Sequence, residues 1–167
     1  RLFYNRDLLR KAGYEAPPET LHEFFEMCEK LEQMESSAGV PLVPIAAFND
    51  IARNFLLERW ARPFTWRLAH EFDFYMTGDP PFSAVYAAWE TGQWSFDHPR
   101  VRAYFKSARK LASYFMPGFM AMQRDQATFA FVQERAAMMI AGATDAAYLF
   151  GASEFDIGVT RVALPGE

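Results

Sequence analysis

The stretch from Phe129 to Pro165 constrains the fold of this chain more than any other segment. Its pattern predicts a helix, a buried strand at 136–140, a glycine turn at Gly142, a second helix and a final strand at 156–164. A strand that leads through a glycine turn into a helix N-terminus brings backbone amides and short polar side chains together. We therefore expect an α/β fold with a small-ligand site at the end of this strand.

The remaining sequence predicts more helices than strands, which makes the whole an α-rich α/β fold. Strands are predicted at 2–4 and 41–47, and helices at 5–12, 20–35, 49–62, 84–90, 97–116 and 125–135. Four helix starts are predicted. Thr20 and Glu23 can form a capping box, and Asn49 or Asp50 can cap the next helix. Asp97 followed by Pro99 opens the long helix, and Asp125 caps the one after it. Gly78, Asp79, Pro80 and Pro81 predict a turn.

Composition limits the class of protein. A chain of 167 residues suits one domain, and a hydrophobic content of 51% argues against disorder. The formal net charge of -4, with arginines scattered among carboxylates, argues against nucleic-acid binding. No apolar run is long enough to predict a membrane span. The chain starts at Arg1 without a methionine, which favours a processed chain or an excised fragment.

Cysteine and histidine usage argues against a metal site. Cys28 is the only cysteine, so an internal disulfide is impossible. Its helical spacing with Phe25 and Leu31 predicts a buried structural thiol rather than a reactive one. The three histidines are far apart, and HEFFE at 22–26 lacks the second histidine of a zinc-protease helix. We expect neither a metal nor a cofactor.

Two blocks of sequence resemble the extracellular solute-binding proteins of ABC importers, in the carbohydrate-binding family that includes maltose receptors. The first block, FYNRDLLRKAGYEAPPETLHEFFEMCEKL at 3–31, matches through Tyr4, Asn5, Asp7, Leu8, Ala12, Gly13, Pro17, Pro18, Thr20 and Glu23. The second matches through Phe131, Glu134, Arg135, Ala136, Ala137, Met138, Gly142, Asp156, Gly158, Val159, Leu164, Pro165 and Gly166. The resemblance covers nearly the whole chain and is weakest between residues 65 and 95.

The resemblance implies one lobe of a periplasmic-binding-protein-like (type II) fold, in which two α/β lobes close over a ligand. Residues 1–167 correspond to the second lobe, so the first lobe is expected before Arg1 and returning helices after Glu167. Such proteins capture a sugar or oligosaccharide and deliver it to a membrane permease. They act in the periplasm or outside the cell, and some carry a lipid anchor. With neighbouring parts missing, we also expect this segment to self-associate.

Sugar binding needs an aromatic ring for the apolar sugar face and planar polar groups for the hydroxyls. Candidates follow two predicted strands, with possible stacking rings nearby: Phe48, Asn49, Asp50, Thr144, Asp145, Trp60 and Trp66. Each has a structural alternative. Asn49 or Asp50 can simply cap a helix, the two tryptophans can belong to the core, and Asp145 can be a first-turn helix charge.

Thr144 departs from the resemblance, since sugar binders of this family often carry tryptophan at that position. A hydroxyl forms hydrogen bonds but cannot stack on a sugar ring. A small polar or cationic solute such as a polyamine, with Asp50 and Asp145 as counter-charges, therefore stays open as the alternative.

Other function classes find little support in the sequence. The chain has no nucleophile elbow, phosphate loop or dinucleotide fingerprint, and its acids form no distinctive pair, so we do not expect an enzyme. A glycan-processing domain is the remaining enzymatic alternative. A helical interaction module would explain the amphipathic helices but not the two ordered blocks of resemblance.

Overall fold

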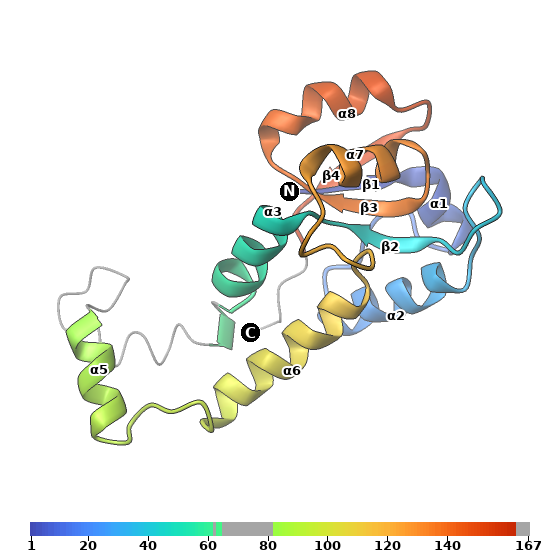
Figure 1. The fold of residues 1–167 in the computed structure, drawn as a ribbon. Coiled ribbons are helices and arrows are strands. Elements are labelled where there is room, and N and C mark those ends of the chain that lie inside the picture. Colours follow the sequence, from blue (N-terminus) through green and yellow to red (C-terminus); the bar gives the residue numbers. More distant parts are fainter. Residues whose placement is uncertain (62, 65–81, 163–167) are drawn as a thin grey trace.

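One mixed four-stranded sheet organises the protein (Figure 1). The computed structural model describes residues 1–61, 63–64 and 82–162. The strands are β1 (Leu2–Asn5), β2 (Val43–Ala46), β3 (Ala136–Ile140) and β4 (Ile157–Thr160), in the spatial order β2-β3-β1-β4. β3 is parallel to β2, and β1 is antiparallel to both β3 and β4. Phe3 pairs with Met139 on one side and with Val159 on the other.

The helices surround this sheet and account for most of the chain. They are α1 (Arg6–Lys11), α2 (Leu21–Glu32), α3 (Asn49–Asn54), α5 (Phe82–Glu90), α6 (Pro99–Ser113), α7 (Arg124–Val132) and α8 (Ala146–Ala152). A π-helical turn, η1 (Phe55–Arg59), extends α3, and a 3-10 turn, η2 (Ala143–Asp145), precedes α8. The helix-rich α/β prediction is confirmed.

Alternating side chains divide the core into two layers, one on each face of the sheet. Leu2, Tyr4, Met138 and Ile140 face the layer beneath α2 and α6. Phe3, Met139 and Ala46 face the other layer, together with residues of α7 and α8. Every residue of β3 is buried, as expected for a central strand covered on both faces. Figure 1 shows α7 and α8 on one side of the sheet and α2 and α6 on the other.

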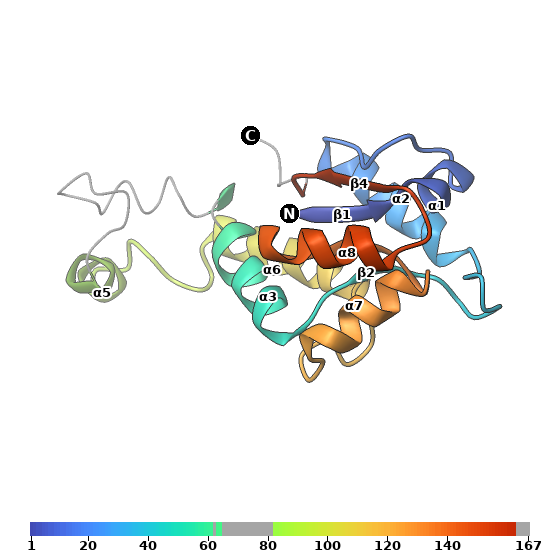
Figure 2. The same ribbon diagram turned by 90° about the horizontal axis from the view of Figure 1, so that it is seen from above.

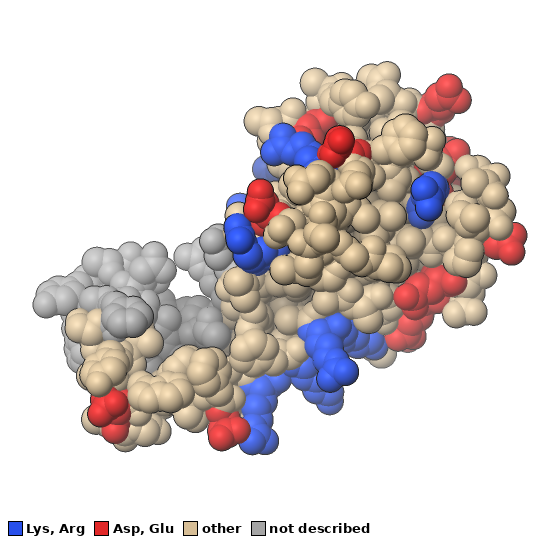
Figure 3. Space-filling view, viewed as in Figure 1, with Lys and Arg blue, Asp and Glu red and all other residues tan. Residues whose placement is uncertain are grey.

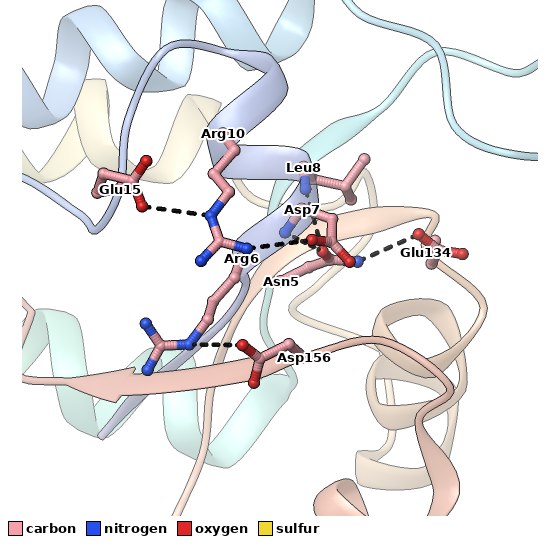
Figure 4. A network of polar contacts seen from close by, with 8 residues as sticks. All are labelled: Asn5, Arg6, Asp7, Leu8, Arg10, Glu15, Glu134 and Asp156. Atoms are coloured by element: carbon pink, nitrogen blue, oxygen red, sulfur yellow. Dashed lines mark hydrogen bonds and ion pairs between the residues drawn. The ribbon is translucent and has the colours of Figure 1, made fainter.

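The two blocks that carry the family resemblance meet where β1 passes into α1 (Figure 4). Asn5 is fully buried, and its Oδ1 accepts hydrogen bonds from the amides of Asp7 (2.9 Å) and Leu8 (3.0 Å). Its Nδ2 donates to Oε2 of Glu134 at 3.2 Å. Arg6 Nε lies 3.3 Å from Asp156 Oδ2. Residues far apart in the sequence thus stabilise one junction.

Gly158 of the second block lies directly opposite Tyr4 in the β1–β4 pair. The Tyr4 ring covers the α-carbon of Gly158, so a Cβ at this position would overlap the ring. The glycine is therefore required for close packing of the buried tyrosine rather than for an unusual backbone conformation.

Three predicted helix caps are wrong. The cap position of α3 is Phe48, not Asn49 or Asp50, and neither of these side chains caps the helix. His98 caps α6 in place of Asp97, because its Nδ1 accepts from the Arg100 amide at 3.3 Å. α7 starts at Arg124 after Gln123, so Asp125 lies within its first turn.

The capping box predicted at α2 forms only in part. Thr20 Oγ1 accepts from the Glu23 amide at 3.4 Å, as expected. The Glu23 carboxylate, however, accepts a 2.6 Å bond from the Thr20 hydroxyl instead of bonding the Thr20 backbone.

Other sequence predictions agree with the described elements. The strands near 2–4, 41–47 and 136–140, and the short helix near 84–90, are all present. The final strand is shorter than predicted and ends at Thr160. The turn predicted at 78–81 lies outside the described residues. Cys28 is fully buried, and this burial raises the pKa of its thiol, as expected for a structural cysteine.

Candidate functional site

The candidate site lies where the parallel strands β2 and β3 end. Because these strands are parallel neighbours, with Ala46 opposite Met139, the segments that follow them emerge at the same edge of the sheet. The segment after β2 leads through Phe48 into α3, and the segment after β3 leads through Gly142 into η2 and α8. The crevice at the carboxyl ends of strands is a frequent ligand position in α/β folds.

Phe48 and Asp145, predicted separately from the sequence, are brought together by Arg124 at the start of α7. The Arg124 guanidinium carbon lies 5.6 Å from the centre of the Phe48 ring. Its Nη1 lies 3.4 Å from Asp145 Oδ1. A cation over an aromatic face and beside a carboxylate is held in a defined orientation. Arg124 therefore joins Asp145 to Phe48, which is only 6% exposed and does not itself line the groove described below.

Asp145 is held on both of its carboxylate oxygens. Oδ2 accepts a 2.8 Å hydrogen bond from the Gly142 amide, while Oδ1 is the oxygen near Arg124. Its side chain is only 12% exposed. Asp145 thus fixes the glycine turn, in line with the structural alternative raised from the sequence. Thr144, beside it, is exposed.

Asn49 and Asp50 lie in the first turn of α3. The backbone amide of Asn49 donates to the Met122 carbonyl at 3.1 Å, which connects this turn to the segment before α7. The Asp50 side chain is 76% exposed and pairs with Arg53 at 3.3 Å. Figure 3 shows acidic and basic side chains intermixed over α3 and the start of α7, so this surface carries no large field of one sign.

A shallow groove runs between the start of α7 and the η2–α8 segment. Its lining includes Gln123, Arg124, Gln126, Phe129, Thr144, Asp145 and Tyr148. The side chains of Phe129 and Tyr148 are 58% and 63% exposed, respectively. The groove, which Asp125 also lines, therefore combines open aromatic rings with amide, guanidinium, carboxylate and hydroxyl groups, which is the chemistry that sugar recognition requires.

Sequence reasoning missed Arg124, Phe129 and Tyr148. Phe129 and Tyr148 lie within the stretch that most constrained the fold, but helical spacing alone did not distinguish a groove face from a core face. Arg124 gave no local signal, because only the tertiary packing of α7 beside β2 places it over Phe48.

Trp60, predicted as a stacking ring, does not line this groove in the described structure. It is fully buried, its Nε1 donates to Ser107 Oγ at 3.1 Å, and its ring packs 5.9 Å from that of Phe55. Trp66 lies outside the described residues.

Residues 1–61, 63–64 and 82–162 contain no cluster of three His, Cys, Asp or Glu side chains suited to hold a metal ion. They also contain no helix whose length and hydropathy would let it cross a bilayer.

The helix-rich architecture with a small mixed sheet is that of one lobe of a two-lobe solute-binding protein. Residues 1–166 match the family model described as bacterial extracellular solute-binding protein. The chain belongs to this family. No curated protein matches the chain by sequence.

Solved structures share the fold of this chain. A chitin oligosaccharide binding protein has 19% identity and a TM-score of 0.66, with 99% of this chain and 38% of that chain covered. A family 1 extracellular solute-binding protein from Bifidobacterium longum subsp. infantis has 26% identity and a TM-score of 0.61, with 99% and 39% covered. The binding protein RafE in complex with raffinose has 16% identity and a TM-score of 0.66, also with 99% and 39% covered. The chain therefore spans less than two-fifths of the length of each of these structures.

Proposed function

We propose that this chain forms one wall of the binding cleft of a receptor that captures a sugar or oligosaccharide. The observation that carries this proposal is the groove between α7 and α8, where two exposed aromatic rings lie beside planar polar side chains. The chitin oligosaccharide binding protein and RafE in complex with raffinose, which share this fold, are consistent with it. Because their sequence identity to this chain is low, they show only a shared fold, and the proposed ligand class rests on the side chains of the groove.

Two other rings of the groove could take the place of the tryptophan that position 144 lacks. A ring is absent at position 144, but Tyr148 follows one helical turn later and Phe129 lies across the groove on α7. Both Thr144 and Tyr148 line the groove, so Tyr148 can supply a stacking ring beside the hydroxyl of Thr144. Arg124 and the two glutamines then provide hydrogen-bond donors for hydroxyl groups.

A cationic solute such as a polyamine is the weaker alternative. Its proposed counter-charges are Asp50 and Asp145, and both carboxylates already have arginine partners, Arg53 and Arg124. A carboxylate neutralised in this way attracts an external cation less strongly. Exposed rings beside donors therefore favour a neutral polyhydroxyl ligand.

The proposal extends to the whole receptor of which this chain is a part. We place the chain in the second lobe, with a first lobe closing over the groove and an ABC-importer permease receiving the solute. The receptor would act in the periplasm or outside the cell, with a lipid anchor as one means of attachment. Binding without chemistry is proposed, so release of reducing sugar from a panel of glycosides would contradict it.

Calorimetric titration of the full-length protein with a saccharide panel tests this function. We expect saturable binding that Tyr148→Ala weakens by roughly three- to tenfold, the range expected for loss of one stacking ring. Phe150→Ala is the matched control, since Phe150 is 54% exposed on the same helix but does not line the groove. Binding of a polyamine instead of any saccharide, or equal losses in the two variants, would overturn the assignment.

A further inference from the structure

A second surface, on α5, α6 and the segment between them, is unrelated to the proposed solute groove. Four aromatic rings of this region contact one another: Trp89, Trp94, Phe96 and Phe105. The ring centres of Trp89 and Phe96 lie 5.5 Å apart, and those of Phe96 and Phe105 lie 6.5 Å apart. Trp89, Phe96 and Phe105 are 44%, 58% and 49% exposed. We call these four residues the aromatic cluster.

The aromatic cluster is not shaped as a platform for a flat ligand. Its rings meet at interplanar angles between 47° and 73°, so no two neighbours form one continuous plane. Sugar stacking needs an open, flat ring face, whereas insertion among lipid headgroups needs only exposed aromatic area with polar surroundings.

A cationic stripe adjoins the aromatic cluster on α6. Helix α6 contains Arg100, Arg102, Lys106, Arg109 and Lys110 and no acidic residue. Arg102, Lys106 and Arg109 follow each other at spacings of four and three, so they share one helix face, and all three are exposed. Figure 3 shows lysine and arginine side chains gathered along the surface below α6.

We call Arg102, Lys106 and Arg109 the cationic stripe, and two of these three charges can interact with an external anion. Arg102 is paired with Asp97 at 2.6 Å and Lys110 with Glu29 at 3.1 Å. Among the described contacts, Lys106 and Arg109 have no acidic partner. The stripe is thus a local positive surface on a chain whose formal net charge is -4. Phe105 lies three residues after Arg102 and four before Arg109, so its ring shares a helix face with these two charges.

We propose that the aromatic cluster and the cationic stripe together contact an anionic phospholipid surface. Aromatic residues prefer the headgroup region of a bilayer, and lysine and arginine are attracted to its acidic lipids. Helix α5 lies well away from the sheet in both ribbon views (Figures 1 and 2), and three of the four rings are at least 44% exposed. The contact is peripheral and reversible, and it does not depend on which solute the groove binds.

Vesicle co-sedimentation of the purified full-length protein tests the proposal. We expect binding to vesicles of equal parts phosphatidylcholine and phosphatidylglycerol, little binding to pure phosphatidylcholine, and loss of binding as salt is raised. One charge near an anionic surface changes partitioning about fivefold, so Lys106→Glu with Arg109→Glu should lower it at least about 25-fold. Lys11→Glu with Arg135→Glu is the control, because it changes net charge equally on exposed residues elsewhere.

A second pair of variants separates the aromatic contribution from charge. Phe96→Ser with Phe105→Ser leaves the net charge unchanged and should also lower binding to anionic vesicles severalfold. Equal binding to both vesicle types, equal losses in the charge-reversal pair and its control, or absence of binding to any vesicle would overturn the proposal. The protein should not sediment in the absence of vesicles. If it does, and light scattering shows a dimer or larger species, the surface mediates self-association and the proposal is overturned.

Discussion

At the scale of single residues, two positions accept few side chains, each for a different physical reason. Gly158 has an ordinary backbone conformation but lies under the Tyr4 ring. Glu134 has room for a side chain but holds a left-handed backbone with φ of 56°. The sequence indicated that both belong to a family motif, but it did not show these reasons. The first depends on β1 packing beside β4, and the second on how the turn after α7 closes.

Gly158→Ala should destabilise the protein by about 2–3 kcal/mol, because the added methyl group overlaps the buried Tyr4 ring and forces the β1–β4 pair apart. Gly151→Ala is the control. No atom lies within 4 Å of a Cβ at Gly151, and the residue is helical. This control should be neutral or stabilise by up to about 1 kcal/mol. Urea denaturation measures both free energies of unfolding, and equal values for the two variants would contradict the packing argument.

Glu134→Ala should destabilise more than Glu134→Gly, by about 1 kcal/mol. Both changes remove the hydrogen bond from Asn5, so their difference isolates the cost of the left-handed backbone for a residue with a Cβ. Chemical denaturation of the two variants in parallel gives this difference. A glycine variant no more stable than the alanine variant would show that the backbone at this turn is not strained.

At the scale of elements, one carboxylate connects α2 to α6 and to the residue that ends it. Glu29 Oε1 accepts from Lys110 Nζ and from the Tyr114 hydroxyl, both at 3.1 Å. The hydrogen bonds from Lys110 and Tyr114 lower the pKa of Glu29. Burial, together with the bond to Glu29, raises the pKa of the Tyr114 hydroxyl. These directions are those expected when a carboxylate is stabilised by a cation and a neutral donor.

This contact predicts a pH dependence of stability on the acid side. A carboxyl with a lowered folded pKa contributes stability above its ordinary pKa of 4.5, and that contribution is lost as pH falls through the lower folded value. Glu29→Gln should therefore lose less stability than the wild type as the pH falls below 4.5. Thermal unfolding across acidic pH compares this variant with Glu19→Gln, a change at an exposed position before α2. Identical pH profiles for wild type and Glu29→Gln would be incompatible with the contact.

Helix existence could be predicted from periodicity, whereas helix starts could not. Val101, Tyr104 and Leu111 have the spacing of a buried face, and α6 buries them. Its start was assigned to Asp97 because aspartate is a common cap, but His98 has the cap geometry. Capping depends on backbone geometry at one residue, which is set by how the preceding loop packs.

At the scale of the whole molecule, the sequence predicted the class of fold but not the sheet that builds the site. The strands near 2–4, 41–47 and 136–140 could be read from short apolar runs. Their order could not, because β1 lies between β3 and β4 through pairings more than a hundred residues apart. The edge that carries Phe48 and Asp145 follows from that order. The role of Arg124 depends on the packing of α7 beside this edge, which the sequence does not show.

The central claim is that a saccharide binds in the groove between α7 and α8. Its most direct test is an NMR titration of the assigned full-length protein with the saccharide that binds best in calorimetry. The account predicts saturable shifts of the Arg124 side-chain Nε–H signal and of the backbone amides at 123–126 and 143–148, with little change at Phe150. Saturable shifts that leave these signals unmoved and cluster elsewhere in the protein would contradict it.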